Sequence, residues 1–145
     1  MTRTTAIVDT NVVVAGLLTC HNESPVARML EGMLTAGFPF VLSEALLAEY
    51  RTVLLRPVLR KLHGLNVVEV EALLTDIALH AIVLIPVSLP ALPFAPRAPD
   101  PGDQLLWNLL AARADLVLVT GDKLLLRDAS MLGRVVSPLE FLSSE

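Results

Sequence analysis

Thr5-Ala6-Ile7-Val8-Asp9, near the start of the chain, is a β-branched and apolar run that ends in a carboxylate. A second apolar run, Leu116-Val117-Leu118-Val119, stands far along the chain, with Asp122 close behind it. Strands that are short, uniformly apolar and separated by helices are typical of a parallel sheet with helices on both faces. The sequence therefore predicts an α/β fold: three layers, α/β/α, around a mainly parallel sheet of four to five strands.

The chain between and beyond these two runs alternates helical and strand patterns. Ser24 followed by Pro25 is typical of a helix start, and apolar residues then recur at helical spacing until Gly37. Other helices are expected from Ser43 to just before Pro57, over about Val67–Leu79, from Asp100-Pro101 through Leu110, and at the C-terminus. Other strands are expected over Phe38–Leu42, Ala81–Ile85 and Arg134–Val136. The proline-rich segment Pro86–Pro101 is expected to be an extended crossing loop.

The composition indicates one globular domain. The chain has 145 residues, of which 54% are hydrophobic and 18% charged. A chain of this length builds its own core, so residues 1–145 are predicted to form a single domain. Average domains have about 45–50% apolar and about 25% charged residues, so this chain is more apolar and less charged than average. Part of the apolar excess is expected to lie on a surface that meets a partner. The single Cys20 cannot form an internal disulfide, which fits the cytoplasm.

Membrane insertion and binding by bulk charge are both disfavoured. The longest stretch without a charged residue runs from Ile77 to Pro96, and four prolines break it, so no membrane span is expected. The first residues do not have the pattern of a signal peptide. The net charge of −4 argues against a protein held on nucleic acid by its overall charge. Any contact with nucleic acid is therefore expected to be local.

Asp9 and Asp122 are the first candidate site residues. In open parallel sheets, ligands bind beyond the carboxyl ends of the strands, near the point where the strand order reverses. Both aspartates follow predicted strands, so their carboxylates approach each other if the two strands are neighbours. The structural alternative for each is an Asp that starts a turn or caps the next helix.

Two further acids extend this set. Asp103 lies in Asp100-Pro101-Gly102-Asp103, where an acid, a proline and a second acid also make a good helix start without any function. Glu49 lies at the border of the apolar stripe of its helix. Glu44 is explained by its place in the first turn of the same helix, so periodicity weakly favours Glu49.

These residues carry a resemblance to a known family. Four blocks look, in order and spacing, like the acidic motifs of PIN-domain nucleases: Ala6-Ile7-Val8-Asp9-Thr10-Asn11, Leu47-Ala48-Glu49-Tyr50-Arg51, Asp100-Pro101-Gly102-Asp103-Gln104 and Val119-Thr120-Gly121-Asp122-Lys123. More narrowly, the chain resembles the PIN-family toxin components of bacterial and archaeal toxin–antitoxin pairs. The similarity covers nearly the whole chain, including a closing block over residues 136–141.

The resemblance implies a set of roles. Catalytic and metal-binding acids would be Asp9, Glu49, Asp103 and Asp122, with Thr10, Asn11, Asp100 and Thr120 in support. It also implies an RNA substrate, an antitoxin protein as partner, and a homodimer; the residue pattern itself does not separate RNA from DNA. The chain departs from the family pattern at Gly102, where the family often has a further Asp.

Carboxylates gathered in this way favour a divalent cation. At a separation of roughly 5 Å and an effective dielectric of about 20, each pair of like charges costs on the order of 3 kcal/mol. Hard oxygen ligands select Mg²⁺ or Mn²⁺, and no Cys/His spacing in the sequence indicates a zinc site. The chemistry that fits is hydrolysis of a phosphodiester with water as the nucleophile.

Basic residues near the acids are candidate phosphate contacts: Arg51, Arg56, Arg60, Lys61 and Lys123. The alternative is an ordinary solvated helix face, because charge clusters of this size are common. Trp107 and Tyr50 are expected in the core or at an interface rather than as platforms for base stacking.

Two other classes of function stay open. Asp9 as a covalent nucleophile would make the chain a phosphatase or a receiver domain, but the phosphatase pattern needs a second Asp where Asn11 stands, and the receiver pattern needs paired acids. The second alternative is an interaction module that keeps the fold and has lost the chemistry.

Overall fold

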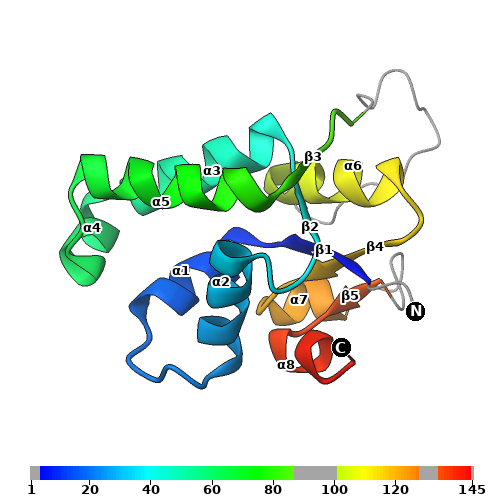
Figure 1. Ribbon diagram of the computed structural model, residues 1–145. Coiled ribbons are helices and arrows are strands. Elements are labelled where there is room, and N and C mark those ends of the chain that lie inside the picture. Colours follow the sequence, from blue (N-terminus) through cyan, green and yellow to red (C-terminus); the bar gives the residue numbers. More distant parts are fainter. Residues whose placement is uncertain (1–3, 87–100, 128–133, 145) are drawn as a thin grey trace.

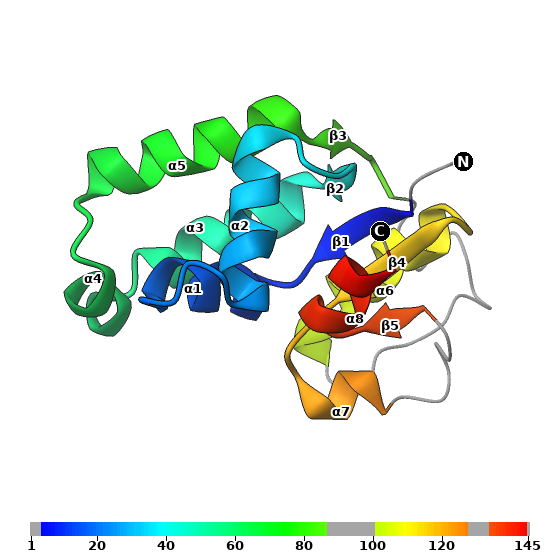
Figure 2. The same cartoon turned by 60° about the horizontal axis from the view of Figure 1, so that its bottom comes forward.

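The strands pair in parallel in one sheet. A computed structural model describes residues 4–86, 101–127 and 134–144, and within them five strands lie in the order β3-β2-β1-β4-β5. Figure 2 shows them side by side. Their bounds are Thr5–Val8 (β1), Phe40–Leu42 (β2), Ile82–Val83 (β3), Leu116–Val119 (β4) and Val135–Val136 (β5). The predicted α/β/α architecture with a parallel sheet of four to five strands is confirmed.

β1 occupies the centre of the sheet, and every described residue of it is buried. It pairs with β2 on one side and with β4 on the other, where Val8 stands opposite Val119. The chain adds β2 and β3 outward on the first side and then returns to place β4 on the second. The strand order therefore reverses between β1 and β4, which is where such sheets bind ligands.

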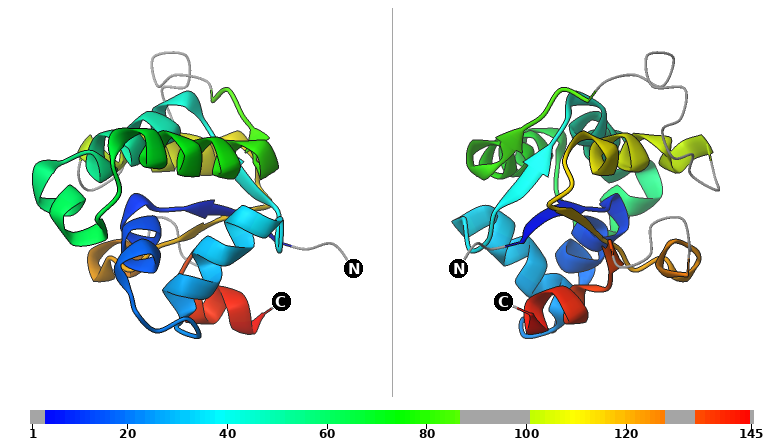
Figure 3. Two further views of the ribbon diagram at one scale, coloured as in Figure 1. Left: turned by 60° about the vertical axis from the view of Figure 1, so that its left-hand side comes forward. Right: turned by 90° about the vertical axis from the view of Figure 1, so that its right-hand side faces the viewer.

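Helices cover both faces of this sheet (Figures 1 and 3). One face carries α3 (Glu44–Leu54), α5 (Val67–His80) and α6 (Gln104–Ala112); the other carries α1 (Thr10–Leu18), α2 (Pro25–Thr35) and α8 (Pro138–Ser143). The short α7 (Lys123–Leu126) lies beside β5, and α4 (Pro57–His63) joins α3 to α5 at the end farthest from the sheet. Helices on both faces explain why the strands are apolar throughout rather than alternating.

The core lies between these layers. Ile7 and Phe40 of the sheet have no exposed surface, and the same holds for Trp107 of α6 and Tyr50 of α3. The expectation that the two larger aromatic residues are core residues is confirmed.

Several boundaries differ from those expected. The helix that begins after Ser24 ends at Thr35, and the next residue, Ala36, adopts the left-handed conformation with φ 56°. Gly37 donates its N–H to the Gly32 carbonyl. A 3₁₀ turn, η2 (Pro101–Asp103), precedes α6, so that helix starts at Gln104. The strands β2 and β3 are shorter than expected.

The helix α4 was not expected as a separate element. Pro57 occupies its first position, where a missing N–H costs nothing, and Gly64 ends it in the left-handed conformation. Most of the proline-rich segment expected as a crossing loop, residues 87–100, lies outside the described residues, and so does Asp100. Within the described ranges, none of the helices has the length and apolar character needed to cross a bilayer.

Candidate functional site

Asp9 lies at the carboxyl end of β1, directly beside the end of β4. Its N–H donates to the Val119 carbonyl (2.9 Å), which extends the pairing of the two strands. The side chain is only 7% exposed, and although Asp9 precedes α1 it does not cap that helix. Its Oδ2 instead accepts a hydrogen bond from Thr120 Oγ1 at 2.7 Å.

The Thr120 hydroxyl joins the ends of both strands. It is fully buried and accepts hydrogen bonds from the N–H of Asp122 (3.0 Å) and from Nδ2 of Asn11 (3.4 Å). Asn11 Oδ1 in turn accepts the N–H of Gly121 at 3.2 Å. A hydroxyl has one donor and two acceptor positions, so the contacts of Thr120 use all three. The loop after β4 is thus fixed against the start of α1.

Glu49 reaches the same junction from α3. Its Oε2 accepts a hydrogen bond of 2.7 Å from the hydroxyl of Thr10, the residue after Asp9. Glu44 lies one and a half turns earlier, exposed in the first turn of α3. The structure therefore brings Glu49, and not Glu44, to the end of β1.

The electrostatics of Asp9 connect three of the predicted acids. Burial is the main effect that raises the pKa of Asp9 to about 6, and the charges of Asp103 and Glu49 act in the same direction. Hydrogen bonds from Thr120 and Thr10 oppose the rise. No cationic group of the described residues is among the groups that shift this pKa. Among the described residues, the charged groups that act on Asp9 are therefore both acids.

Asp103 and Asp122 have different local roles. Asp103 ends the turn η2 and stands at the N-cap position of α6, but its side chain does not cap the helix. Asp122 does cap: its Oδ1 accepts the N–H of Leu124 in α7 at 2.9 Å. Helix capping by the side chain, the structural alternative considered for both aspartates, is therefore observed for Asp122 and not for Asp9.

A divalent cation suits the chemistry of these donors. Within the described ranges, no three His, Cys, Asp or Glu side chains are grouped so that they could hold an ion by themselves. Mg²⁺ does not need such a cage, since proteins commonly bind it through one or two carboxylates together with waters and substrate phosphates. A buried carboxylate whose charged form is disfavoured, with two more acids acting on it, fits an ion of this kind.

The predicted phosphate contacts divide into two groups. Arg51 is engaged by Glu71 of α5, with contacts of 2.7 Å and 3.3 Å to the two carboxylate oxygens. Arg60 and Lys61, by contrast, are exposed on α4 and line a hollow of about 390 Å³. Arg56, just before α4, and Lys123, beside Asp122, are also exposed.

One contact near the site has no obvious signal in the sequence. Tyr50, expected in the core or at an interface, donates its hydroxyl to the carbonyl of Val8, the residue before Asp9. A buried tyrosine beside a candidate acid could have been a hint, because buried phenol groups need a polar partner.

The family comparison covers most of the chain. A family model described as PIN domain matches residues 5–124. This range contains Asp9, Glu49, Asp103 and Asp122. Among curated proteins, no relative matches the chain.

Proposed function

The chain belongs to the PIN domain family, whose members are generally nucleases, and from this premise we propose that it is a metal-dependent endoribonuclease that acts as the toxin of a toxin–antitoxin pair. The observation that carries the catalytic part is Asp9: a buried carboxylate with a raised pKa, at the reversal of strand order, under the influence of Asp103 and Glu49.

The proposed metal ligands are Asp9, Glu49, Asp103 and Asp122. A bound Mg²⁺ or Mn²⁺ would supply Lewis acidity and a water of lowered pKa for attack on the phosphodiester. Asp9 and Glu49 would contribute from β1 and α3, and Asp103 from the start of α6. Asp122 would have to contribute the carboxylate oxygen that does not cap α7.

Supporting residues would orient these acids. Thr120 donates to Asp9 Oδ2, and Thr10 donates to Glu49 Oε2. Asn11 holds the loop that leads to Asp122. Outer partners of this kind fix the orientation of metal ligands and are commonly worth about 10- to 100-fold in affinity or activity. Asp100 keeps the supporting role that the family pattern implies.

The substrate backbone would be held by exposed cations, one of which stands beside the acid Asp122. Arg56, Arg60, Lys61 and Lys123 are exposed, and α4 contacts α1, the helix that begins beside Asp9. Arg51 is a weaker candidate for a phosphate contact because its guanidinium forms a salt bridge with Glu71.

The proposed partners are an antitoxin protein and a second copy of the chain, in the cytoplasm. Large apolar side chains on the α4–α5 part of the surface support a protein partner: Val58 is 71% exposed, Leu62 63% and Val68 77%. Patches of this kind mark interaction sites.

The test is cleavage of labelled single-stranded RNA by the purified protein, freed of any partner. Cleavage is expected with Mn²⁺ or Mg²⁺, and it is expected to stop with EDTA and in Asp9→Asn. A parallel reaction with single-stranded DNA tests the choice of substrate. In the same assay, Arg60→Gln should raise KM for RNA severalfold, whereas Arg51→Gln, its matched control, should change KM little.

Each other outcome has a definite meaning. Chelator-sensitive cleavage that persists in Asp9→Asn would indicate a contaminating nuclease and would rule out the proposed site. Hydrolysis of an aryl phosphate without cleavage of nucleic acid would support the phosphatase alternative. Metal binding without any hydrolysis would support an interaction module.

A further inference from the structure

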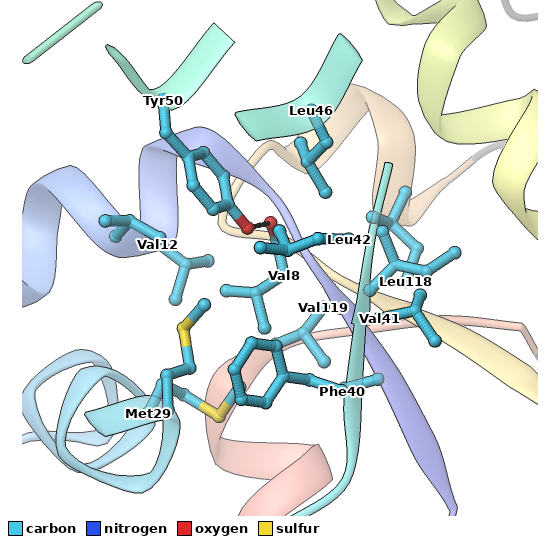
Figure 4. Close-up of a cluster of buried hydrophobic side chains, with 14 of the residues drawn as sticks. Val8, Val12, Met29, Phe40, Val41, Leu42, Leu46, Tyr50, Leu118 and Val119 are labelled. Carbon is cyan, nitrogen blue, oxygen red and sulfur yellow. Dashed lines mark hydrogen bonds between the residues drawn. The ribbon is translucent and has the colours of Figure 1, made fainter. Parts of the chain in front are cut away.

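Tyr50 is the sole tyrosine of the chain and is fully buried on α3, one residue after Glu49. Figure 4 shows its ring packed near Val12, with the hydroxyl directed at the end of β1. The hydroxyl donates a hydrogen bond to the Val8 carbonyl, with 2.5 Å between the two oxygens. The core thus contains one polar contact that ends next to Asp9.

The Val8 carbonyl lacks a donor from the neighbouring strand β2, because the pairing of β2 with β1 ends before Val8. The N–H of Ala6 donates to Pro39 on the β2 side, and in a parallel ladder every second residue of a strand bonds to the same side. The Val8 carbonyl therefore faces β2, but the pairing of β1 with β2 extends only to Ile7. Tyr50 replaces the donor that a longer β2 would have supplied.

The peptide unit before Asp9 is consequently held at both ends. Tyr50 binds its carbonyl from α3, and the Val119 carbonyl of β4 binds its N–H at 2.9 Å. This unit sets the direction in which the Asp9 side chain leaves the strand.

The same turn of α3 also holds the residue after Asp9. Glu49 accepts the hydroxyl of Thr10 at 2.7 Å. Two adjacent residues of α3 therefore contact the two residues that flank Asp9, and Tyr50 provides the contact that is fully buried.

We propose that Tyr50 is a positioning residue of the nuclease site, whose hydroxyl fixes the separation and orientation of the Asp9 and Glu49 carboxylates without touching metal or substrate. The inference rests on the proposed function. Loss of the hydroxyl should weaken the grip on the ion and slow the chemical step. It should leave KM for RNA unchanged, because the substrate backbone is held by other residues.

The experiment compares Tyr50→Phe, which keeps the ring and removes the hydroxyl, with Ser137→Ala. The control removes a hydrogen bond that caps α8, a helix that does not carry any of the proposed acids. Mn²⁺ affinity is measured by calorimetry, and kcat and KM on RNA. Tyr50→Phe is expected to lower Mn²⁺ affinity and kcat each on the order of 10-fold, with KM within twofold of wild type. Ser137→Ala is expected to lower only Tm.

The outcomes separate the inference from the function on which it rests. Equal Mn²⁺ affinity and kcat in Tyr50→Phe and wild type would overturn the positioning role while the nuclease proposal stands. A wild-type protein that neither binds Mn²⁺ nor cleaves RNA would overturn both.

A second measurement applies if Tyr50→Phe does not fold. Replacement of the sole tyrosine with 3-fluorotyrosine keeps the hydroxyl and gives a single ¹⁹F resonance. That resonance is expected to shift when Mg²⁺ is added to saturation, because the hydroxyl bonds the carbonyl of the residue before Asp9. A resonance that stays in place while calorimetry shows Mg²⁺ binding would overturn the inference.

Discussion

The ends of β1 and β4 both lead to an aspartate that stands before a helix, but the two aspartates have different structural roles. Each strand is apolar and buried, and each is followed by an aspartate at the N-cap position of a helix. Asp122 uses its side chain to cap α7, whereas Asp9 leaves α1 uncapped and turns its carboxylate to Thr120. Asp9 is buried and its pKa is raised; Asp122 is partly exposed.

The difference shows what distinguishes a structural aspartate from a reactive one. A capping carboxylate is satisfied by backbone N–H groups and stabilises its helix. A carboxylate such as Asp9, whose burial and two nearby acids outweigh its hydrogen bonds from Thr120 and Thr10, is destabilised in its charged form until a cation binds. Three predictions test this contrast, in order of expected size.

The largest effect is expected in catalysis. Asp9→Asn should lower kcat on RNA by about 1,000-fold, since loss of the ion's contribution is worth several kcal/mol. Asp122→Asn should lower kcat only on the order of 10-fold, because one of the two carboxylate oxygens of Asp122 already accepts a hydrogen bond from α7. Single-turnover kinetics with Mn²⁺ would measure both. Equal losses in the two variants would contradict the contrast between the strand ends.

The second effect is on stability as a function of pH, in protein free of metal. The folded-state pKa of Asp9 is about 6, above the ordinary value of 3.8 for an aspartate side chain. The folded protein therefore keeps this proton where the unfolded chain has released it, so the contribution is complete below about pH 4 and is lost as pH rises through about 6. The loss amounts to about 3 kcal/mol at neutral pH.

Asp9→Asn removes this dependence and provides the measurement. Urea unfolding at pH 4.5 and pH 7 should show Asp9→Asn gaining in free energy of unfolding relative to wild type as the pH rises. Other titrating groups are common to both proteins and cancel in the difference. If the free energies of unfolding of the two proteins changed with pH in the same way, the pKa of Asp9 would not be raised in the folded protein.

The smallest effect concerns the cap itself. Asn caps helices as well as Asp does, so Asp122→Asn should change the free energy of unfolding by only a few tenths of a kcal/mol, whereas Asp122→Ala should cost about 1 kcal/mol. Thermal unfolding of the two variants side by side measures this. If Asp122→Ala were as stable as wild type, the hydrogen bond to Leu124 would not be contributing to the fold.

The sequence predicted the elements well where the physical signal is local. Ser24 before Pro25, and the apolar runs of β1 and β4, indicated elements that the structure contains with nearly the expected bounds. The predicted boundaries of elements were wrong where the signal was not local. Ala36 rather than Gly37 takes the left-handed conformation, and a 3₁₀ turn delays the start of α6.

The candidate site shows the same division. The position of Asp9 after an apolar strand was visible in the sequence, and Glu49 was only weakly preferred over Glu44. The contact of Glu49 with Thr10 joins residues 39 positions apart. The hydrophobic periodicity of one helix carries no information about a partner on another helix. For the same reason, the sequence could not identify Glu71 as the partner of Arg51 or Val8 as the partner of Tyr50.

By itself, the sequence determined a parallel sheet covered on both faces and the presence of an aspartate after two of its apolar strands, because apolar runs and helix starts are properties of neighbouring residues. Only the tertiary structure decided which aspartate caps a helix and which is buried under the influence of other acids. That choice depends on burial and on a hydroxyl 111 positions away, and both exist only once β1 and β4 lie side by side.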